Sequence, residues 1–397
     1  MMNVSAVFIK QYNAIRNGVR QSLVICLCML MAGAVSANHQ SIAESGQVNR
    51  MQVTFINPAA EGEAFWDRVT ELMYMAAHDL NIELEVLFSG GNRLKVLELA
   101  KQTVKRAVKP DYLIFVFQAH LGEHLLKVTE DAGLYSFAIN TNIPAEEQLE
   151  IGSPRERFRY WLGHMFPDEQ HAGFLLATSL YQQARVQQNL SPDDPVAMIA
   201  ISGSEDSAAS RERLEGLDLF LKDHPNVQLQ QIVNAGWQQD KAREITRVLL
   251  ARYPETSIIW AASDLMALGA LQAAVAKGLV PGKTVFSGGI DGTAQGLAAL
   301  AEGKMQASMS GHFMEGAWSM VLLHDHYHGL DFAAKTGMRI RTRLDLIQTG
   351  NVQPYIAQLD KRFFESIDFH HYSLEEATQY HFSQSFIESL PKGRQNR

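Results

Sequence analysis

The sequence contains very little cysteine. Its 397 residues include only Cys26 and Cys28, and both lie within the first thirty positions. Two cysteines without partners elsewhere cannot build a disulfide framework or a four-ligand metal cage. The rest of the chain must therefore be stable through its hydrophobic core alone, which a chain of this length can form.

Excess positive charge is also missing. Lys and Arg number 35 against 43 Asp and Glu, so the formal net charge is −8. A chain with this balance lacks a broad basic surface that could follow a phosphate backbone, so we expect no nucleic-acid partner. The 46% hydrophobic and 20% charged residues are typical of a folded globular protein, and the length predicts about two domains.

Common catalytic and cofactor motifs are absent as well. The sequence has no Gly-x-Ser-x-Gly nucleophile elbow, no Gly-x-x-x-x-Gly-Lys phosphate loop and no Gly-x-Gly-x-x-Gly fingerprint. We therefore predict no cofactor and no catalytic residues. The pair Gly288-Gly289 is interpreted instead as a tight turn where the backbone approaches a ligand.

The N-terminus has the three parts of a secretory signal peptide. Lys10, Arg16 and Arg20 precede a short apolar run over residues 22–33, and small residues follow up to Ala37. The run is shorter than the roughly 20 residues of a membrane span, which disfavours an anchor. Lipidation of a cysteine in the run is a weaker alternative. We predict that residues 1–37 are removed, with both cysteines, and that the mature protein is soluble in the periplasm.

Downstream, strand patterns alternate with helix patterns. In the first half, strands are predicted at 51–56, 82–88, 112–117 and 135–140, and helices at 66–80, 93–108 and 120–131. Gly133 suits the left-handed end of the third helix. Four successive strand–helix units predict a doubly wound parallel sheet with right-handed crossovers.

A second series follows an interruption. Residues 141–167 are polar and arginine-rich and are predicted to be a linker or crossing segment, after which Asp168 is expected to cap a helix. The predicted strands then lie at 196–201, 227–233, 257–260, 284–286 and 305–310, and the helices at 169–188, 206–223, 238–253, 264–277, 293–302 and 313–328. The pattern predicts an α/β protein of two Rossmann-like lobes with parallel sheets. A ligand cleft is expected between the lobes, at the carboxyl ends of the strands.

Polar and aromatic side chains follow many of these strands. They comprise three amides, three aromatic rings, an arginine, a serine and a carboxylate: Asn57, Gln118, Asn140, Phe65, Trp66, Trp237, Arg213, Ser263 and Asp291. Planar donors and acceptors suit hydroxyl groups, and aromatic rings suit the C–H faces of a sugar. We predict that these nine residues bind a small sugar or polyol. The neighbouring Asp264 is expected to be a helix cap instead.

Three motifs carry a resemblance to a known family. They are Ser207-Ala-Ala-Ser-Arg-Glu-Arg-Leu-Glu-Gly216, Trp260-Ala-Ala-Ser-Asp-Leu-Met-Ala-Leu-Gly-Ala270 and Gly288-Gly-Ile-Asp-Gly-Thr293. From about Val53 to Gly316 the chain resembles the ribose- and galactose-type periplasmic binding proteins, which share the effector-binding fold of the lactose repressor. The resemblance implies a type I periplasmic binding fold and assigns sugar contacts to Asn57, Phe65, Trp66, Arg213, Trp237 and Asp291.

The chain departs from the family pattern at several contact positions. Ser263 stands where the family has an asparagine, Asn140-Thr141 where it has an Asp-Arg pair, and Gly311, beside His312, where it has a glutamine. A carboxylate and an arginine that grip ribose-like hydroxyls are therefore absent. These departures predict a ligand other than ribose.

The lobes are expected to interleave along the chain. We predict an N-terminal lobe of 48–165 plus about 312–345, a C-terminal lobe of 166–311 plus about 346–360, and an extension over 361–397. The crossing segment and the extension exceed the usual family length. They could contact a membrane partner or merely cover the surface.

The resulting hypothesis is a monomeric, non-enzymatic solute-binding protein. Its lobes would close on the ligand, and the closed form would be recognised by an importer permease or by the periplasmic domain of a membrane-bound sensor. The alternative is an exported carbohydrate-active enzyme on a similar frame. A transcription repressor is disfavoured because a signal peptide occupies the place of the DNA-binding head.

A histidine cluster near residue 326 is the stronger metal candidate of the sequence, and His370-His371 is a weaker one. His324 and His328 are spaced i, i+4 on a predicted helix, which can bind zinc. Gly329 ends that helix, where protonated histidines interact favourably with the helix dipole. We therefore predict no metal ligands, although the sequence leaves open whether this cluster binds a metal.

Overall fold

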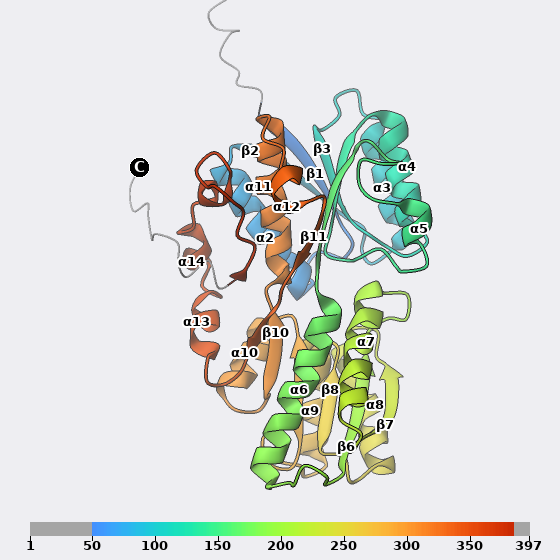
Figure 1. Cartoon of the computed structure of the whole chain (residues 1–397), viewed down its shortest axis with the longest axis vertical. Coiled ribbons are helices and arrows are strands. Elements are labelled where there is room, and N and C mark those ends of the chain that lie inside the picture. The colour runs from blue at the N-terminus through green and yellow to red at the C-terminus, as the bar shows by residue number, and fades with distance from the viewer. Residues whose placement is uncertain (1–49, 385–397) are drawn as a thin grey trace, which may run out of the picture. The chain divides into compact units, whose positions relative to one another are not determined.

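The chain forms two six-stranded sheets with helices packed on both faces (Figure 1). The computed structural model describes residues 50–384, so the signal peptide predicted at 1–37 lies outside the described residues. Neighbouring strands are parallel except for one antiparallel pair in the second sheet, in which residues 308–310 pair with residues 345–347. The predicted α/β class with two Rossmann-like sheets is therefore confirmed.

The first sheet contains five strands from the first half of the chain and one late strand. The strands are β1 (Met51–Asn57), β2 (Ile82–Phe88), β3 (Tyr112–Val116), β4 (Tyr135–Ile139), β5 (Trp161–Pro167) and β11 (Arg339–Thr342). They lie side by side in the order β11-β5-β4-β3-β1-β2. The interior strands are almost wholly buried, as expected for a parallel sheet covered on both faces.

Helices cover the two faces of this sheet separately (Figure 1). On one face α2 (Ala64–Asp79) packs against α11 (Glu315–Tyr327), and on the other α3 (Arg93–Val104) packs against α4 (Gly122–Ala132). Gly133 has a φ of 62° at the end of α4, as the sequence predicts. The carboxyl ends of the strands are thereby left uncovered by these helices.

The segment 141–167 is more structured than the predicted linker. It contains a short helix, α5 (Gln148–Ile151), and the strand β5, all seven residues of which are buried. Polar neighbours hid the apolar run of β5 in the sequence. One of them, Arg155, lies outside the strand and pairs with Asp331 at 2.6 Å. The prediction of a simple linker was therefore wrong.

The second sheet has the order β12-β10-β9-β8-β6-β7. Its strands are β6 (Val196–Ser202), β7 (Val227–Asn234), β8 (Ile258–Ala261), β9 (Phe286–Ile290), β10 (Ala307–Ser310) and β12 (Asp345–Ile347). Its helices are α6 (Glu169–Gln188), α7 (Ala208–Asp223), α8 (Gln239–Arg252), α9 (Asp264–Ala276) and α10 (Ala294–Ala301). Asp168 caps α6, as predicted, by accepting a hydrogen bond from His171 N.

Gly288 and Gly289 lie inside β9 and not in a turn. A Cβ on Gly288 would lie 2.5 Å from Ala307 O, and one on Gly289 would lie 2.5 Å from Asp264 N. The absence of side chains therefore lets β9 pack closely against β10 and the start of α9. The tight turn follows two residues later, where Asp291 and Gly292 have φ angles of 132° and 63°.

The last part of the chain returns to the first sheet, adds a strand to the second sheet and then packs against the cores of both. After β10, η2 (His312–Met314) leads into α11, and α12 (Ala333–Thr336) precedes β11. Beyond β12 come α13 (Val352–Ala357), α14 (Lys361–Glu365) and η3 (Phe369–Tyr372). Phe364, Phe369 and Tyr372 are buried in the core formed by α2 and α11. The predicted lobe boundaries stay a prediction.

Across residues 50–384, no helix combines the length and the hydropathy that crossing a membrane requires.

Candidate functional site

A pocket of about 530 Å³ lies among the loops that follow the strands of both sheets. Its lining comes from the carboxyl ends of strands in the first sheet and in the second, which is where open α/β sheets bind ligands. Eight of the nine predicted site residues line it: Phe65, Trp66, Gln118, Asn140, Arg213, Trp237, Ser263 and Asp291. Tertiary structure thus brings together side chains that are up to 226 positions apart, from Phe65 to Asp291.

Asn57 is the predicted site residue that does not line the pocket. Its side chain is fully buried, with Nδ2 donating to Thr70 Oγ1 and Oδ1 accepting from Ala59 N. Because both ends of the amide are engaged, Asn57 fixes the turn from β1 toward α2. In this structure Asn57 supports the loop, and its predicted contact with a ligand stays a prediction.

Two aromatic rings from the first turn of α2 form one wall of the pocket. Glu63 caps this helix by accepting from Phe65 N and Trp66 N, which fixes both backbone positions. The two rings meet edge to face with centroids 5.2 Å apart. Phe65 also stacks on His312, with centroids 4.6 Å apart. The aromatic wall therefore joins α2 to η2, the short helix that follows β10 of the second sheet.

Trp237 forms a second aromatic surface on the other side of the pocket. Its φ of 67° lies in the left-handed region, which few non-glycine residues adopt. A Cβ on Gly203 would come within 2.1 Å of its ring, so the ring packs directly on the Gly203 backbone. The guanidinium of Arg213 lies 5.6 Å from the ring centroid. These contacts orient Trp237 without any ligand.

Arg213 is held by a buried carboxylate. Its Nε and Nη2 donate to the two oxygens of Glu169, both at 2.7 Å, and its Nη1 donates to Ala262 O at 2.6 Å. Both charged side chains are nearly inaccessible to water. A bidentate pair of this kind satisfies the guanidinium and fixes its plane. The positive charge of Arg213 is therefore largely neutralised from within the protein.

Asp291 lies between Arg213 and His312. Its Oδ1 is 3.6 Å from Arg213 Nη1 and 3.5 Å from His312 Nε2. Burial raises the pKa of Asp291, and the charge of Glu169 raises it further, although Arg213 acts in the opposite direction. Burial lowers the pKa of His312 to about 3, so its ring is neutral. The Asp291 carboxyl therefore lies in the pocket lining between the guanidinium of Arg213 and the ring of His312.

Asp264 does not cap its helix as the sequence predicts. Ser263 caps α9 by accepting from Met266 N, whereas Asp264 accepts from Ser308 Oγ at 2.7 Å and from Thr293 N at 2.8 Å. Burial raises the pKa of the Asp264 carboxyl. The residue therefore ties α9 to β10 and to the start of α10, below the pocket.

The amide side chains at the ends of β3 and β4 keep unused hydrogen-bonding capacity. Gln118 Oε1 and Asn140 Nδ2 are buried, and neither has a partner among the described residues. Buried polar atoms without partners are uncommon in folded proteins. One acceptor and one donor are therefore available to a molecule in the pocket.

Four further ionisable residues of the pocket were missed as candidates: Glu63, Arg93, Asp206 and His312. Arg93 pairs with Asp206 at 3.1 Å and thereby connects α3 with the loop before α7. Glutamate is an unusual helix cap, so Glu63 gave little signal in the sequence. The position of His312 next to a family contact site was the one available indication.

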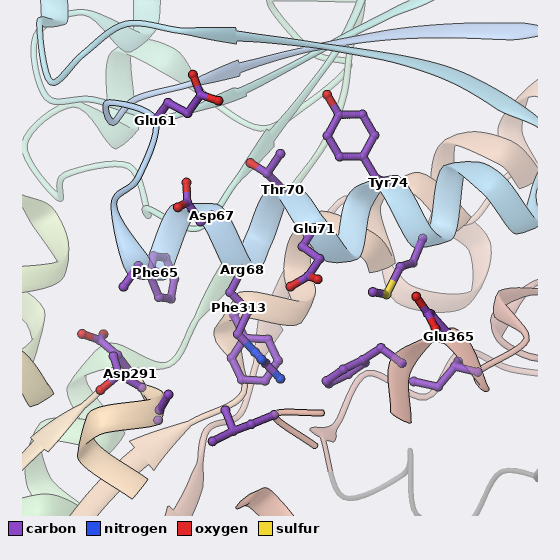
Figure 2. A pocket seen from close by; sticks show the side chains of 18 of the residues that line it. Glu61, Phe65, Asp67, Arg68, Thr70, Glu71, Tyr74, Asp291, Phe313 and Glu365 are labelled. Carbon is purple, nitrogen blue, oxygen red and sulfur yellow. The ribbon is translucent and has the colours of Figure 1, made fainter. Parts of the chain in front are cut away.

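A larger cavity of about 980 Å³ runs along α2 toward the C-terminal segment (Figure 2). Arg68 extends into it between Phe313 and Phe364 and donates to Gln358 O at 2.7 Å. Burial lowers the pKa of Arg68 to about 10. The cavity shares Phe65 and Asp291 with the smaller pocket. The larger cavity runs along a helix, whereas the smaller pocket lies directly at the strand ends of both sheets. We therefore assign the ligand site to the smaller pocket.

Comparison with solved structures gives a near-complete match. A periplasmic sugar-binding protein from Pseudomonas fluorescens superposes with a TM-score of 0.77 at 28% identity, over 85% of this chain and 99% of that chain. A galactofuranose-binding protein has the same fold, with a TM-score of 0.67 at 17% identity over 79% of this chain and 99% of that one.

Comparison of sequences gives shorter matches. The ribose import binding protein RbsB of Haemophilus influenzae is 36% identical over 118 residues, which are 30% of this chain and 38% of that protein. The galactofuranose-binding protein YtfQ of Escherichia coli is 25% identical over 118 residues, 29% of this chain and 37% of that protein. The chain thus aligns with well under half the length of these curated relatives.

The model of the periplasmic binding protein domain matches residues 53–330, nearly the same stretch as the resemblance seen in the sequence motifs. The two sheets, the pocket at their strand ends and this match agree, and the chain belongs to the periplasmic binding protein family.

Proposed function

We propose that this protein captures a small sugar or related polyol in the pocket between the strand ends of its two sheets. One observation carries the proposal: aromatic rings from both sheets' loops line the same pocket as buried amides that lack partners. A sugar offers apolar C–H faces for the rings and hydroxyl groups for the amides. The proposed ligand contacts are Phe65, Trp66, Gln118, Asn140, Arg213, Trp237, Ser263 and Asp291, together with His312.

The charges of the pocket favour a ligand without net charge. Arg213 would attract an anion, but Glu169 already neutralises it. Asp291 lies in the pocket lining and is partly exposed, so its carboxyl can accept hydrogen bonds from sugar hydroxyl groups. A hydroxylated ligand therefore complements the pocket better than a carboxylate or a phosphate.

The similar proteins support the same ligand class. Their names state ribose import, galactofuranose binding and periplasmic sugar binding. At Ser263 and Asn140-Thr141 this chain lacks the family's asparagine and its Asp-Arg pair. The lost carboxylate and arginine would have gripped adjacent hydroxyl groups. We therefore propose a ligand other than ribose.

We further propose that the protein works in the periplasm as the binding component of an importer. The family and the import function named for a relative support a permease as partner. A sensor partner is not supported by these comparisons, and neither is the alternative of a carbohydrate-active enzyme, because the similar proteins are binding proteins of transporters. Export by residues 1–37 and a monomeric state belong to the same proposal.

A thermal-shift screen against pentoses, hexoses and inositols tests the ligand. The wild-type protein should melt at a higher temperature with one sugar, because a ligand that binds only the native state stabilises it. Trp237→Ala and Asp291→Ala should abolish the shift. Leu149→Ala is the matched control, since this side chain is 97% exposed and lies outside the pocket.

Turnover of the sugar, or full shifts in both pocket variants, would refute the proposal. The role in import is tested separately by uptake of the labelled sugar in cells that lack the gene. Lost uptake supports an importer. Unchanged uptake with a lost transcriptional or chemotactic response would assign the protein to a sensor instead.

A further inference from the structure

The C-terminal extension meets the end of α11 at a cluster of metal-ligating side chains. His324 and His328 from α11 and Glu375 from the extension place one ligand atom each within 4.8 Å of one another. The three residues come from two segments that are distant in sequence. The cluster lies outside both cavities described above. It therefore has no part in the proposed sugar site.

The protein fixes the tautomer of His328. Its Nδ1 lies 2.9 Å from His324 O, and a carbonyl oxygen can only accept, so Nδ1 carries the proton. Nε2 of His328 then presents its lone pair. Metal-ligating histidines commonly donate their other ring N–H to a carbonyl or carboxylate in this way.

His324 is buried, which is unusual for a histidine that merely interacts with a helix dipole. It is 4% exposed, and its Nδ1 has no hydrogen-bond partner of good geometry among the described residues. Nδ1 lies 3.5 Å from Oδ1 of Asp325. The nearby carboxylate favours a proton on Nδ1 and leaves Nε2 as the ligand atom.

Asp325 also fixes the third ligand. Its carboxylate accepts from Ser373 Oγ at 2.5 Å, from Leu374 N at 2.8 Å and from Tyr380 Oη at 2.6 Å. Glu375 directly follows Leu374, and its own N–H donates to Ser373 Oγ at 3.0 Å. The backbone that presents Glu375 is thus anchored to α11 by the residue next to His324.

We propose that His324, His328 and Glu375 bind one zinc ion, which clasps the C-terminal extension to α11. Two imidazoles and one carboxylate form a ligand set that zinc uses, with a fourth position for water. Zn–N bonds of about 2.0–2.1 Å require ligand atoms about 3.3 Å apart. The exposed side chains of His328 and Glu375 can close that distance by rotation, whereas calcium would need six to eight oxygen ligands.

Zinc binding is tested on the purified exported protein without a polyhistidine tag, after removal of metals with a chelator. Titration with zinc chloride, followed by calorimetry and by metal analysis after dialysis, should give one zinc per chain. His328→Gln and Glu375→Gln should each weaken binding by at least about tenfold. Calcium chloride should not compete.

His78→Gln is the matched control, because His78 is also an exposed histidine in the last turn of a helix, beside Asp79 at 3.4 Å. This variant should bind zinc as the wild type does. Equal affinity in the wild type, His328→Gln and Glu375→Gln would overturn the proposal, as would the absence of stoichiometric binding. Melting temperatures measured without metal show whether each variant is folded.

Hydrogen exchange gives a second readout that does not depend on affinity. Zinc should slow the exchange of backbone amides over residues 373–381 in the wild type, because it holds this segment on α11. The same addition should have no effect in Glu375→Gln. Zinc-independent exchange in the wild type would contradict the clasp even if some zinc were bound elsewhere.

Discussion

At the scale of single residues, the buried charges of the pocket depend on how they are paired. Glu169 and Arg213 form a bidentate pair in which both side chains are almost fully buried. Removing one partner would leave an uncompensated charge away from water, and this costs far more than losing an exposed pair. Glu169 therefore supports the pocket without belonging to its lining.

We expect Glu169→Ala to destabilise the protein by about 3–5 kcal/mol, because Arg213 loses both of its carboxylate bonds. Urea unfolding followed by circular dichroism measures the change. The control is Glu146→Ala, which removes an exposed pair with Arg211 at 3.3 Å and should cost about 1 kcal/mol or less. Equal losses in the two variants would contradict the assigned role of Glu169.

Buried histidines make the stability dependent on pH. Burial lowers the pKa of His164 from its ordinary 6.5 to about 3, and the ring donates from Nε2 to Thr141 O at 2.9 Å. Between these pH values the unfolded chain binds the proton and the folded chain does not. Stability is therefore lost as the pH falls through this window, and Arg339 nearby acts in the same direction.

The expected slope for one such histidine is up to about 1.4 kcal/mol per pH unit. Unfolding free energies measured between pH 4.5 and 6.5 should therefore fall less steeply in His164→Gln than in the wild type. His312 should contribute in the same direction, because burial also lowers its pKa to about 3. Leu149→Ala, which changes an exposed side chain without a titratable group, should keep the wild-type slope, and an unchanged slope in His164→Gln would refute the explanation.

At the scale of elements, α6 and α7 cross through glycines below the pocket. A Cβ on Gly173 would lie 2.0 Å from Arg213 O, and one on Gly216 would lie 2.0 Å from Gln170 O. Close approach of the two backbones places Glu169, at the start of α6, within reach of Arg213 on α7. Gly173 and Gly216 therefore support the pocket, because they let α6 and α7 approach closely enough for Glu169 to pair with Arg213.

We expect Gly216→Ala to destabilise the protein by about 1–3 kcal/mol, because the methyl group meets backbone atoms that cannot move aside. The sugar affinity should fall as well, since a shift of α7 displaces Arg213. Gly350→Ala is the control, because this glycine has open space around its Cβ position. Wild-type urea midpoints in both variants would show that the helices can separate at no cost.

At the scale of the whole described chain, side chains from the two sheets' loops meet around the pocket. Besides Arg93 and Asp206, the amide of Asn142 donates to Glu212 at 2.8 Å. Burial raises the pKa of Glu212 to about 7. Contacts of this kind hold the two sets of loops together around the pocket. A ligand that binds the form with these contacts better shifts the population toward it.

Asp206→Asn should weaken sugar binding by up to about fivefold, because an exposed ion pair contributes about 1 kcal/mol or less. Calorimetry with the sugar found in the screen measures the change, which should shrink in about 0.5 M salt. Asp218→Asn is the control, since its partner Lys222 lies on the same helix at 2.6 Å. A loss in the control as large as that in Asp206→Asn would rule out a specific role for the pair.

The sequence by itself determined most of the local structure and the family. Unbroken apolar runs such as Tyr112–Val116 predicted buried strands because a parallel sheet is covered on both faces. Gly133 predicted a helix end because it tolerates a positive φ. The edge that carries the site also followed, since successive strand–helix units place their strand ends together.

Only the tertiary structure decided which side chains are free to bind. Asn57 follows a strand as the other candidates do, yet its amide is engaged by Thr70 and Ala59 and lies outside the pocket lining. The strand β5 was missed because an arginine-rich segment directly precedes its apolar run. Hydrogen-bond partners and burial arise from contacts between distant segments, and these contacts have no trace in the local pattern of the sequence. For the same reason the sequence did not indicate that Glu375 lies beside His324 and His328.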